Sequence, residues 1–87
     1  MDDSKQIELV AIETAASEFR AALMQEIIKA RTKQGLSQMK LAELSGVKQP
    51  VIARMERGYT SPQIDTILKV LVPLGKTLYI GDLPQDE

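Results

Sequence analysis

Residues 35–58 have the sequence G-L-S-Q-M-K-L-A-E-L-S-G-V-K-Q-P-V-I-A-R-M-E-R-G, which is the pattern of two short helices joined by a tight turn. Ser37 can cap the first helix by accepting a hydrogen bond from a free backbone N–H. Gly46 permits the left-handed backbone that ends one helix and reverses the chain. Pro50 falls in the first turn of the second helix, where a missing N–H costs little. The segment therefore predicts a helix-turn-helix.

The second helix of this pair has one face for the core and one for a partner. Steps of 100° per residue place Ile52 and Met55 on one face. The other face carries Pro50, Ala53, Arg54 and Arg57. The second helix of a helix-turn-helix has a size and phase suited to the DNA major groove. We therefore expect a DNA-binding surface on this face.

These residues resemble the XRE-type (Cro and cI repressor-like) helix-turn-helix family over about residues 19–74. Within that family the chain is most similar to HigA-like antitoxins of type II toxin-antitoxin operons. Their recognition segment G-V-x-Q-P-x-I-x-R-x-E-x-G matches residues 46–58, and their S-P-x-x-x-T and L-G-K-x-L segments match residues 61–66 and 74–78. The resemblance implies an all-α, five-helix, lambda-repressor-like DNA-binding domain.

Length and composition limit the classes of function. A chain of 87 residues is one small domain, which buries only about 60% of its unfolded surface, so a homodimer is favoured. There is no cysteine and no histidine, which removes thiolate nucleophiles, the commonest general base and the commonest metal ligands. No catalytic residues, metal site or cofactor are predicted, and the chain is not expected to be an enzyme.

The chain is expected to be cytoplasmic, with no membrane partner. No apolar run approaches the roughly 20 residues of a membrane span. The N-terminus, Met1-Asp2-Asp3, is acidic where a signal peptide would be basic.

The net charge of −1 is small, but the charges are unevenly distributed. Residues 1–28 carry six acidic and two basic side chains, a net charge of −4. Residues 29–58 carry seven basic and two acidic side chains (+5), and residues 59–87 carry two basic and four acidic ones (−2). The basic block coincides with the helix-turn-helix, as a phosphate-binding face requires. The acidic ends either suit a second, basic partner or only confer solubility.

The rest of the chain is expected to add helices and one strand. The segment before residue 14 is either a helix or a segment that folds on binding. A long helix is predicted over about 14–33, and another begins at Ser61-Pro62 and runs to about Leu74. The apolar stripe of the long helix comprises Phe19, Ala22, Leu23, Ile27 and Ala30. The expected divisions are an N-terminal extension (1–16), the helix-turn-helix domain (17–75) and a C-terminal strand and tail (76–87).

The C-terminal strand is predicted over residues 76–80, K-T-L-Y-I, and no other segment of the chain is predicted to pair with it. Pairing with its copy in a second subunit would satisfy its backbone groups; alternatively the segment is a frayed tail. In the helix before it, Val70 and Val72 are left over once the core face is covered. The predicted dimerisation residues are therefore Val70, Val72, Leu78, Tyr79 and Ile80.

Base contacts are expected at the start and on the outer face of the second motif helix. Lys48 and Gln49 begin this helix, and the family resemblance makes Gln49 a base-contacting residue, with adenine its bidentate partner. Pro50 and Val51 can contact a thymine methyl. Arg54 either reads guanine through its O6 and N7 acceptors or clamps a phosphate.

Phosphate contacts are expected around these base contacts. Gln38, at the start of the first motif helix, directs its amide to a phosphate or a base edge, or is a solvated surface side chain. Lys40 replaces the family's usual acidic residue three positions after the cap and places a cation where phosphate approaches. Arg57 is expected to bind phosphate. In the resembled family, the residues matching Arg31 and Glu56 form a partly buried structural ion pair.

Two functional hypotheses follow. The first is an antitoxin that represses its own operon at an inverted-repeat operator in double-stranded DNA and also neutralises a HigB/RelE-like mRNA-cleaving toxin. The second is a stand-alone XRE-type repressor. Such repressors often carry a ligand or oligomerisation domain, for which 87 residues leave no room, so the antitoxin is favoured. The predicted toxin-binding residues are Ile7, Glu8, Val10, Ile12 and Glu13.

Overall fold

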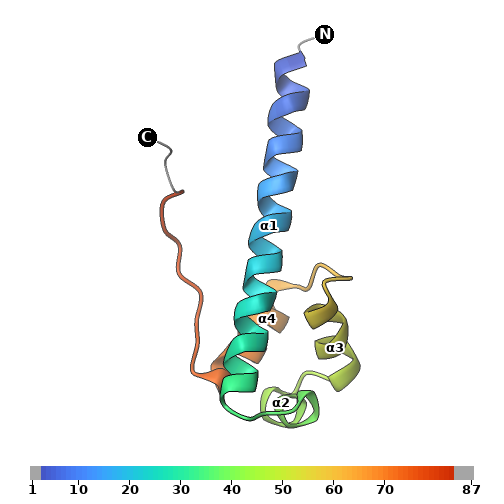
Figure 1. Cartoon of the computed structure of the whole chain (residues 1–87), viewed down its shortest axis with the longest axis vertical. Coiled ribbons are helices and arrows are strands. Elements are labelled where there is room, and N and C mark those ends of the chain that lie inside the picture. Colours follow the sequence, from blue (N-terminus) through green and yellow to red (C-terminus); the bar gives the residue numbers. More distant parts are fainter. Residues whose placement is uncertain (1–2, 84–87) are drawn as a thin grey trace.

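Four α-helices and one short 3-10 helix make up the fold in the computed structural model, which describes the backbone of residues 3–83 and the side chains of residues 8–83. The elements, in chain order, are α1 (Asp3–Lys33), α2 (Gln38–Ser45), α3 (Gln49–Arg57), α4 (Ile64–Leu71) and the 3-10 helix η1 (Val72–Leu74). Figure 1 shows α2, α3 and α4 gathered around the C-terminal part of α1, whose N-terminal part projects away from them.

The all-α class is confirmed, but the expected number of helices was wrong. Instead of a separate first segment and a helix over 14–33, the chain forms one continuous helix, α1, of 31 residues. The physical reason is that no glycine or proline lies between Asp3 and Lys33, so nothing interrupts the helical hydrogen bonds. The division expected near residue 16 therefore falls inside α1.

The end of α1 is fixed by a backbone motif around Gly35. Gly35 has φ +70°, and its N–H donates to Thr32 O at 3.0 Å while Leu36 N–H donates to Arg31 O at 3.0 Å. This pair of bonds is a Schellman motif, which satisfies carbonyl groups that the last helical turn leaves free. Leu36 then packs against the core, so the same motif directs the chain into α2.

A single apolar core joins all the elements. Its buried members are Met24, Ile27 and Ala30 from α1, Leu41 from α2, Val47 from the turn, Ile52 and Met55 from α3, Ile67, Val70 and Leu71 from α4, and Leu74 from η1. The buried residues of α1 begin only at Met24. Phe19 is 54% exposed and Ala22 is exposed, so the first part of the predicted apolar stripe does not cover this core.

Val70 was wrongly assigned to the dimer contact, because its side chain is 0% exposed. It lies one turn after Ile67 and one turn before Leu74, and all three are buried on the face of α4 and η1 that meets the core. The exposed apolar side chains of this region are instead Ile64, Leu68 and Val72.

The segment after η1 is not a strand in the described chain. Residues 76–83 are extended, and Figure 1 shows them running back in the direction of the N-terminal part of α1. A strand needs a neighbour for its backbone groups, and residues 3–83 contain no second extended segment that pairs with this one. Tyr79 and Ile80 are almost fully exposed. The predicted strand was therefore wrong for the single chain.

No helix within residues 3–83 is both long enough and apolar enough to cross a membrane.

Candidate nucleic-acid interface

The turn between α2 and α3 has the capping that its sequence predicts. Ser37 Oγ accepts a hydrogen bond from Lys40 N–H at 3.0 Å, which caps the start of α2. Gly46 ends α2 with φ +75°, and its N–H donates to Ala42 O at 2.9 Å. The prediction of a helix-turn-helix at residues 35–58 is thereby confirmed. Ser45 Oγ also accepts a bond from Val47 N–H at 3.1 Å and so orders the turn.

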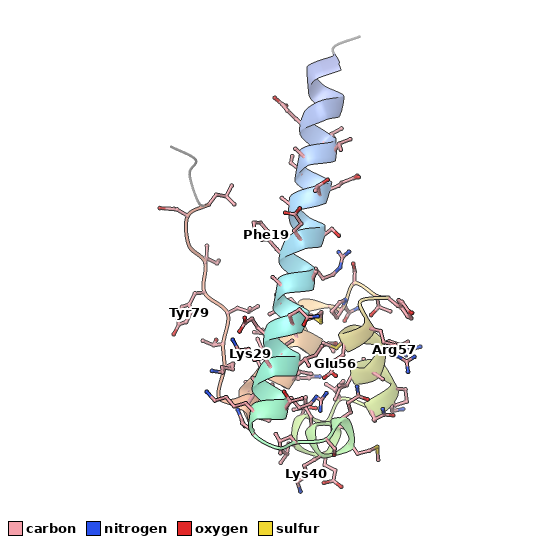
Figure 2. All side chains as sticks on the ribbon, in the orientation of Figure 1. Phe19, Lys29, Lys40, Glu56, Arg57 and Tyr79 are labelled. Atoms are coloured by element: carbon pink, nitrogen blue, oxygen red, sulfur yellow. The ribbon has the colours of Figure 1, made fainter. Side chains whose placement is uncertain are left out.

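The position of α3 follows from its buried face. Ile52 and Met55 are each 1% exposed and lock α3 onto the core, so the opposite face has to point outward. Figure 2 shows Glu56 on the side of α3 that faces α1 and Arg57 on the outer side. Arg54 and Pro50 are exposed as well. The outer face of α3 thus carries the exposed cationic side chains of Arg54 and Arg57.

The predicted DNA-binding residues fall into two groups. Lys40, Lys48, Pro50, Arg54 and Arg57 are exposed, whereas Gln38, Gln49 and Val51 are half-buried. Val51 packs against the core, so only part of its side chain remains for a base methyl. Lys40 Nζ lies 3.3 Å from Glu43 Oε2, but both side chains are mostly exposed, so the pair leaves Lys40 available to a phosphate.

Arg31 and Glu56 form the ion pair that the family resemblance implies. Arg31 Nε donates to Glu56 Oε2 at 2.7 Å and Nη2 donates to Glu56 Oε1 at 2.8 Å, a bidentate arrangement. The two side chains are 12% and 8% exposed. Arg31 Nη1 also donates to Leu36 O at 2.8 Å. The pair therefore ties the end of α1 to the end of α3 and to the loop that enters α2.

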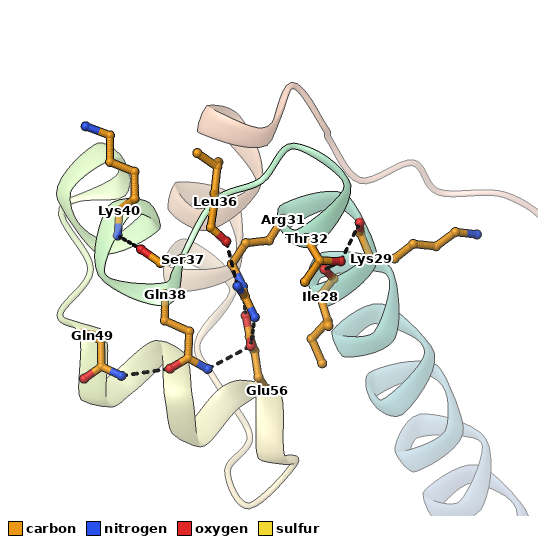
Figure 3. Close-up of polar contacts among 10 residues, drawn as sticks. All are labelled: Ile28, Lys29, Arg31, Thr32, Leu36, Ser37, Gln38, Lys40, Gln49 and Glu56. Atoms are coloured by element: carbon orange, nitrogen blue, oxygen red, sulfur yellow. Dashed lines mark hydrogen bonds and ion pairs between the residues drawn. The ribbon is translucent and has the colours of Figure 1, made fainter.

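Two glutamines extend this ion pair to the surface (Figure 3). Gln38 Nε2 donates to Glu56 Oε1 at 2.9 Å, and Gln49 Nε2 donates to Gln38 Oε1 at 2.8 Å. Gln38 and Gln49 are the first residues of α2 and α3, so the two helix starts are held side by side. This contact was not predicted from the sequence, because it depends on how α2 packs against α3.

The predicted toxin-binding residues lie far along α1 from the core. Glu8, Val10, Ile12 and Glu13 are exposed, and the side chain of Ile7 lies outside the described ones. At 100° per residue, Val10 and Ile12 point to nearly opposite sides of the helix. Ile12 instead shares a face with Leu9, Ala16 and Phe19, and this exposed apolar stripe continues into Leu23 and Ile27 of the core. Among the predicted dimerisation residues, Val72, Leu78, Tyr79 and Ile80 are exposed.

The described residues form neither a small-molecule pocket nor a metal site beside the candidate DNA-binding surface. Within the described residues there is no pocket and no group of three or more His, Cys, Asp or Glu side chains that could hold a metal ion. The surface formed by α2 and α3 carries the exposed cationic side chains of Lys40, Lys48, Arg54 and Arg57, as a surface that binds phosphates requires.

Comparisons with known proteins also find a helix-turn-helix in this chain. A family model described as Helix-turn-helix matches residues 27–80. A protein of Haemophilus influenzae, named an uncharacterized HTH-type transcriptional regulator, is 56% identical over 71 residues, which are 82% of this chain and 72% of that protein. Among solved structures, a chain described as a toxin-antitoxin module from Streptococcus pneumoniae is 60% identical with a TM-score of 0.69, and the match covers 82% of this chain and 79% of that one.

Proposed function

Because the chain belongs to the XRE-type helix-turn-helix family of DNA-binding transcriptional regulators, we propose that it is the antitoxin of a type II toxin-antitoxin operon. In this role it represses its own operon and neutralises the partner toxin by direct binding. The observation that carries the proposal is the 60% identity to a chain of a toxin-antitoxin module, over 82% of this chain. The second candidate is a stand-alone repressor. The similarity to an HTH-type transcriptional regulator fits this candidate as well as it fits an antitoxin that represses its operon.

The DNA half of the proposal uses the outer face of α3 and the start of α2. Gln49 reads adenine, Arg54 reads guanine, and Pro50 with the exposed part of Val51 contacts a thymine methyl. Lys40, Lys48 and Arg57 bind phosphates and hold α3 in the groove. Gln38 keeps one amide N–H that is bonded neither to Glu56 nor to another described side chain, and this group is available to a phosphate.

The dimer is proposed to form through the extended segment after η1. Leu78, Tyr79 and Ile80 carry exposed apolar surface. Within the described residues the backbone forms no hydrogen bond after Lys76, which leaves it able to pair with its copy in a second subunit. Val72 lies next to this segment and is also exposed. A two-fold dimer would present two copies of α3 to successive major grooves and would bind an inverted repeat.

The toxin is proposed to bind the N-terminal part of α1. An enzyme that cuts messenger RNA has to bind phosphates and therefore has a cationic surface. Exposed carboxylates on this part of α1, at Glu8, Glu13 and Glu18, complement such a surface. The stripe of Leu9, Ile12, Ala16 and Phe19 supplies apolar area between Glu8 and Glu13, whereas Glu18 lies on the other side of the helix. Because this site is remote from α3, one dimer can hold toxin and operator together.

Calorimetry with the product of the adjacent gene separates the two candidates. An antitoxin should bind a small, basic HigB/RelE-like protein encoded beside it, and the complex should still bind the operator. If the chain binds its operator but no neighbouring gene product, it is a stand-alone repressor.

A further inference from the structure

The hydrogen bonds that join Glu56, Gln38 and Gln49 all run in one direction, and Glu56 sets that direction. A carboxylate has only acceptor atoms. Since Glu56 Oε1 lies 2.9 Å from the Gln38 amide, Gln38 has to turn Nε2 toward it and Oε1 away. Oε1 then accepts from Gln49 at 2.8 Å, so Gln49 has to turn its own Nε2 inward. The opposite orientation of Gln38 would place two oxygen atoms against each other.

Glu56 cannot change its own role, because Arg31 holds it in place. The guanidinium has only donor groups, and it uses Nε and Nη2 on the two carboxylate oxygens and Nη1 on Leu36 O. With side chains 12% and 8% exposed, water competes little for these bonds. The series of hydrogen bonds thus starts from the Arg31 guanidinium, which can only donate, and the Glu56 carboxylate, which can only accept. The amide groups of Gln38 and Gln49 therefore cannot exchange the places of their nitrogen and oxygen atoms.

The consequence appears at the exposed start of α3. Figure 3 shows Gln49 with Nε2 turned toward Gln38 and Oε1 turned away from it. Gln49 therefore presents Oε1, an acceptor, and the remaining N–H of Nε2, a donor, to the DNA side in a fixed spatial order. Adenine offers a donor at N6 and an acceptor at N7, whereas guanine offers two acceptors at the same edge. An amide that is free to rotate would offer both orders of donor and acceptor, and a fixed amide offers only one.

We propose that Glu56 is a positioning residue for base recognition, because it fixes, through Gln38, the order in which Gln49 presents its donor and acceptor to the operator. Glu56 thereby narrows the base preference at one position of each half-site without touching DNA. The inference rests on the proposed contact between Gln49 and a base. It gives the buried ion pair a role in sequence selection in addition to its role in holding the helices.

Selection from operators with randomised half-sites tests the inference. In Glu56→Gln the new amide can turn either its oxygen or its nitrogen toward Gln38. The donor-to-acceptor order of the hydrogen bonds through Gln38 and Gln49 is then no longer fixed. We expect the preference for adenine at the position that Gln49 contacts to fall at least about fivefold, the lower end of what a good bidentate contact contributes. The dependence of affinity on salt should stay the same, because no phosphate contact is lost.

A second variant tests the same link with the ion pair intact, because Glu56→Gln also weakens the bond to Arg31. Gln38→Met keeps the length of the side chain and removes both polar atoms, and it should lower the same preference. In a Gln49→Met background, Gln38→Met should change nothing further at that base pair, since it acts through Gln49. The matched control is Lys40→Met, two residues further along α2, which should weaken all sequences alike.

Two results would overturn the inference alone. One is a folded Glu56→Gln protein with undiminished preference for adenine. The other is an effect of Gln38→Met at that base pair that persists without Gln49. If Gln49→Met itself changes no base preference, the proposed contact of Gln49 fails and the inference fails with it.

Discussion

Gln34 donates a hydrogen bond from Nε2 to the main-chain oxygen of Leu74 at 2.9 Å, and so joins the end of α1 to the end of the helical domain. Gln34→Ala should lower the free energy of unfolding by about 0.5–1.5 kcal/mol, because the carbonyl of Leu74 loses its partner. Urea unfolding measures the change. Gln25→Ala is the matched control, since Gln25 is exposed on α1, and it should be nearly neutral. Equal losses from both variants would show that the bond to Leu74 contributes nothing.

The ion pair of Arg31 with Glu56 should matter far more for stability than the pair of Lys40 with Glu43. Arg31→Met leaves a nearly buried carboxylate without its cation and should cost about 3 kcal/mol. Lys40→Met removes an exposed pair and should change stability little. The double variant Arg31→Met, Glu56→Met should recover much of the loss, because no charge is left unpaired. Thermal unfolding of the three variants measures this, and a double variant no more stable than Arg31→Met would contradict it.

Arg54 and Lys40 should affect DNA binding in different ways. Arg54→Ala should cost about 1–3 kcal/mol of binding free energy and relax the preference at one base pair. Lys40→Ala should weaken all sequences alike and lower the salt slope by about one unit. Fluorescence titrations on matched and mismatched operators at several salt concentrations distinguish the two. Sequence-independent losses from both variants would make Arg54 a phosphate contact.

Removal of the segment after Lys76 should separate the subunits. Lys76 N–H donates to Leu71 O at 3.0 Å and belongs to the cap of the last helical turn, so the chain is cut after it. The buried core ends at Leu74, and the shortened chain should therefore stay folded. We expect light scattering to show a monomer that binds the operator weakly. A dimer of the shortened chain would place the interface on the exposed side chains of Ile64, Leu68 and Val72 instead.

Deletion of residues 1–16 should abolish or greatly weaken toxin binding and leave operator binding nearly intact. None of the described side chains in the deleted part of α1 belongs to the buried core, whose first member on this helix is Met24. Calorimetry with the purified toxin and with operator DNA measures both affinities. Undiminished toxin affinity would place the toxin on the remainder of α1 or on the C-terminal segment.

Two substitutions identify the side of α1 that the toxin contacts. Val10 and Ile12 are 62% and 64% exposed but point to nearly opposite sides of the helix. Ile12→Asp interrupts the apolar stripe with Leu9 and Phe19 and should weaken toxin binding by tenfold or more, about 1.4 kcal/mol. Val10→Asp makes the same chemical change off the stripe and should have a smaller effect. The opposite ranking would move the contact to the side of α1 that carries Val10.

The elements that the sequence predicted correctly depend on local signals. Ser37, Gly46 and Pro50 each act on their own helix end, so the limits of α2 and α3 could be predicted from them. The phase of α4 within the core could not, because its apolar residues form a broad face, and only Asp65, Thr66 and Lys69 lie on the other side. Periodicity alone did not distinguish Val70, which is buried, from Leu68, which is exposed.

The remaining differences arise from contacts between distant parts of the chain. Residues 76–80 have the composition of a strand, but composition does not supply a partner strand. The bond between Gln38 and Gln49 depends on how α2 meets α3, which no local pattern encodes. For the candidate site, the sequence therefore predicted the exposed cationic side chains, and the structure was needed to show that Gln38 and Gln49 are half-buried and bonded to each other.

The continuity of α1 also bears on how long the protein survives in the presence of proteases. Among the described side chains of α1 before Leu23, none packs against the core, so this part of the helix can unwind while the core stays closed. A protease needs an unwound segment to cut, and a bound partner opposes unwinding in proportion to its occupancy. The rate of cleavage in α1 therefore measures how much of the protein has a partner bound to the apolar stripe. Protein without a bound partner is expected to be cleaved first.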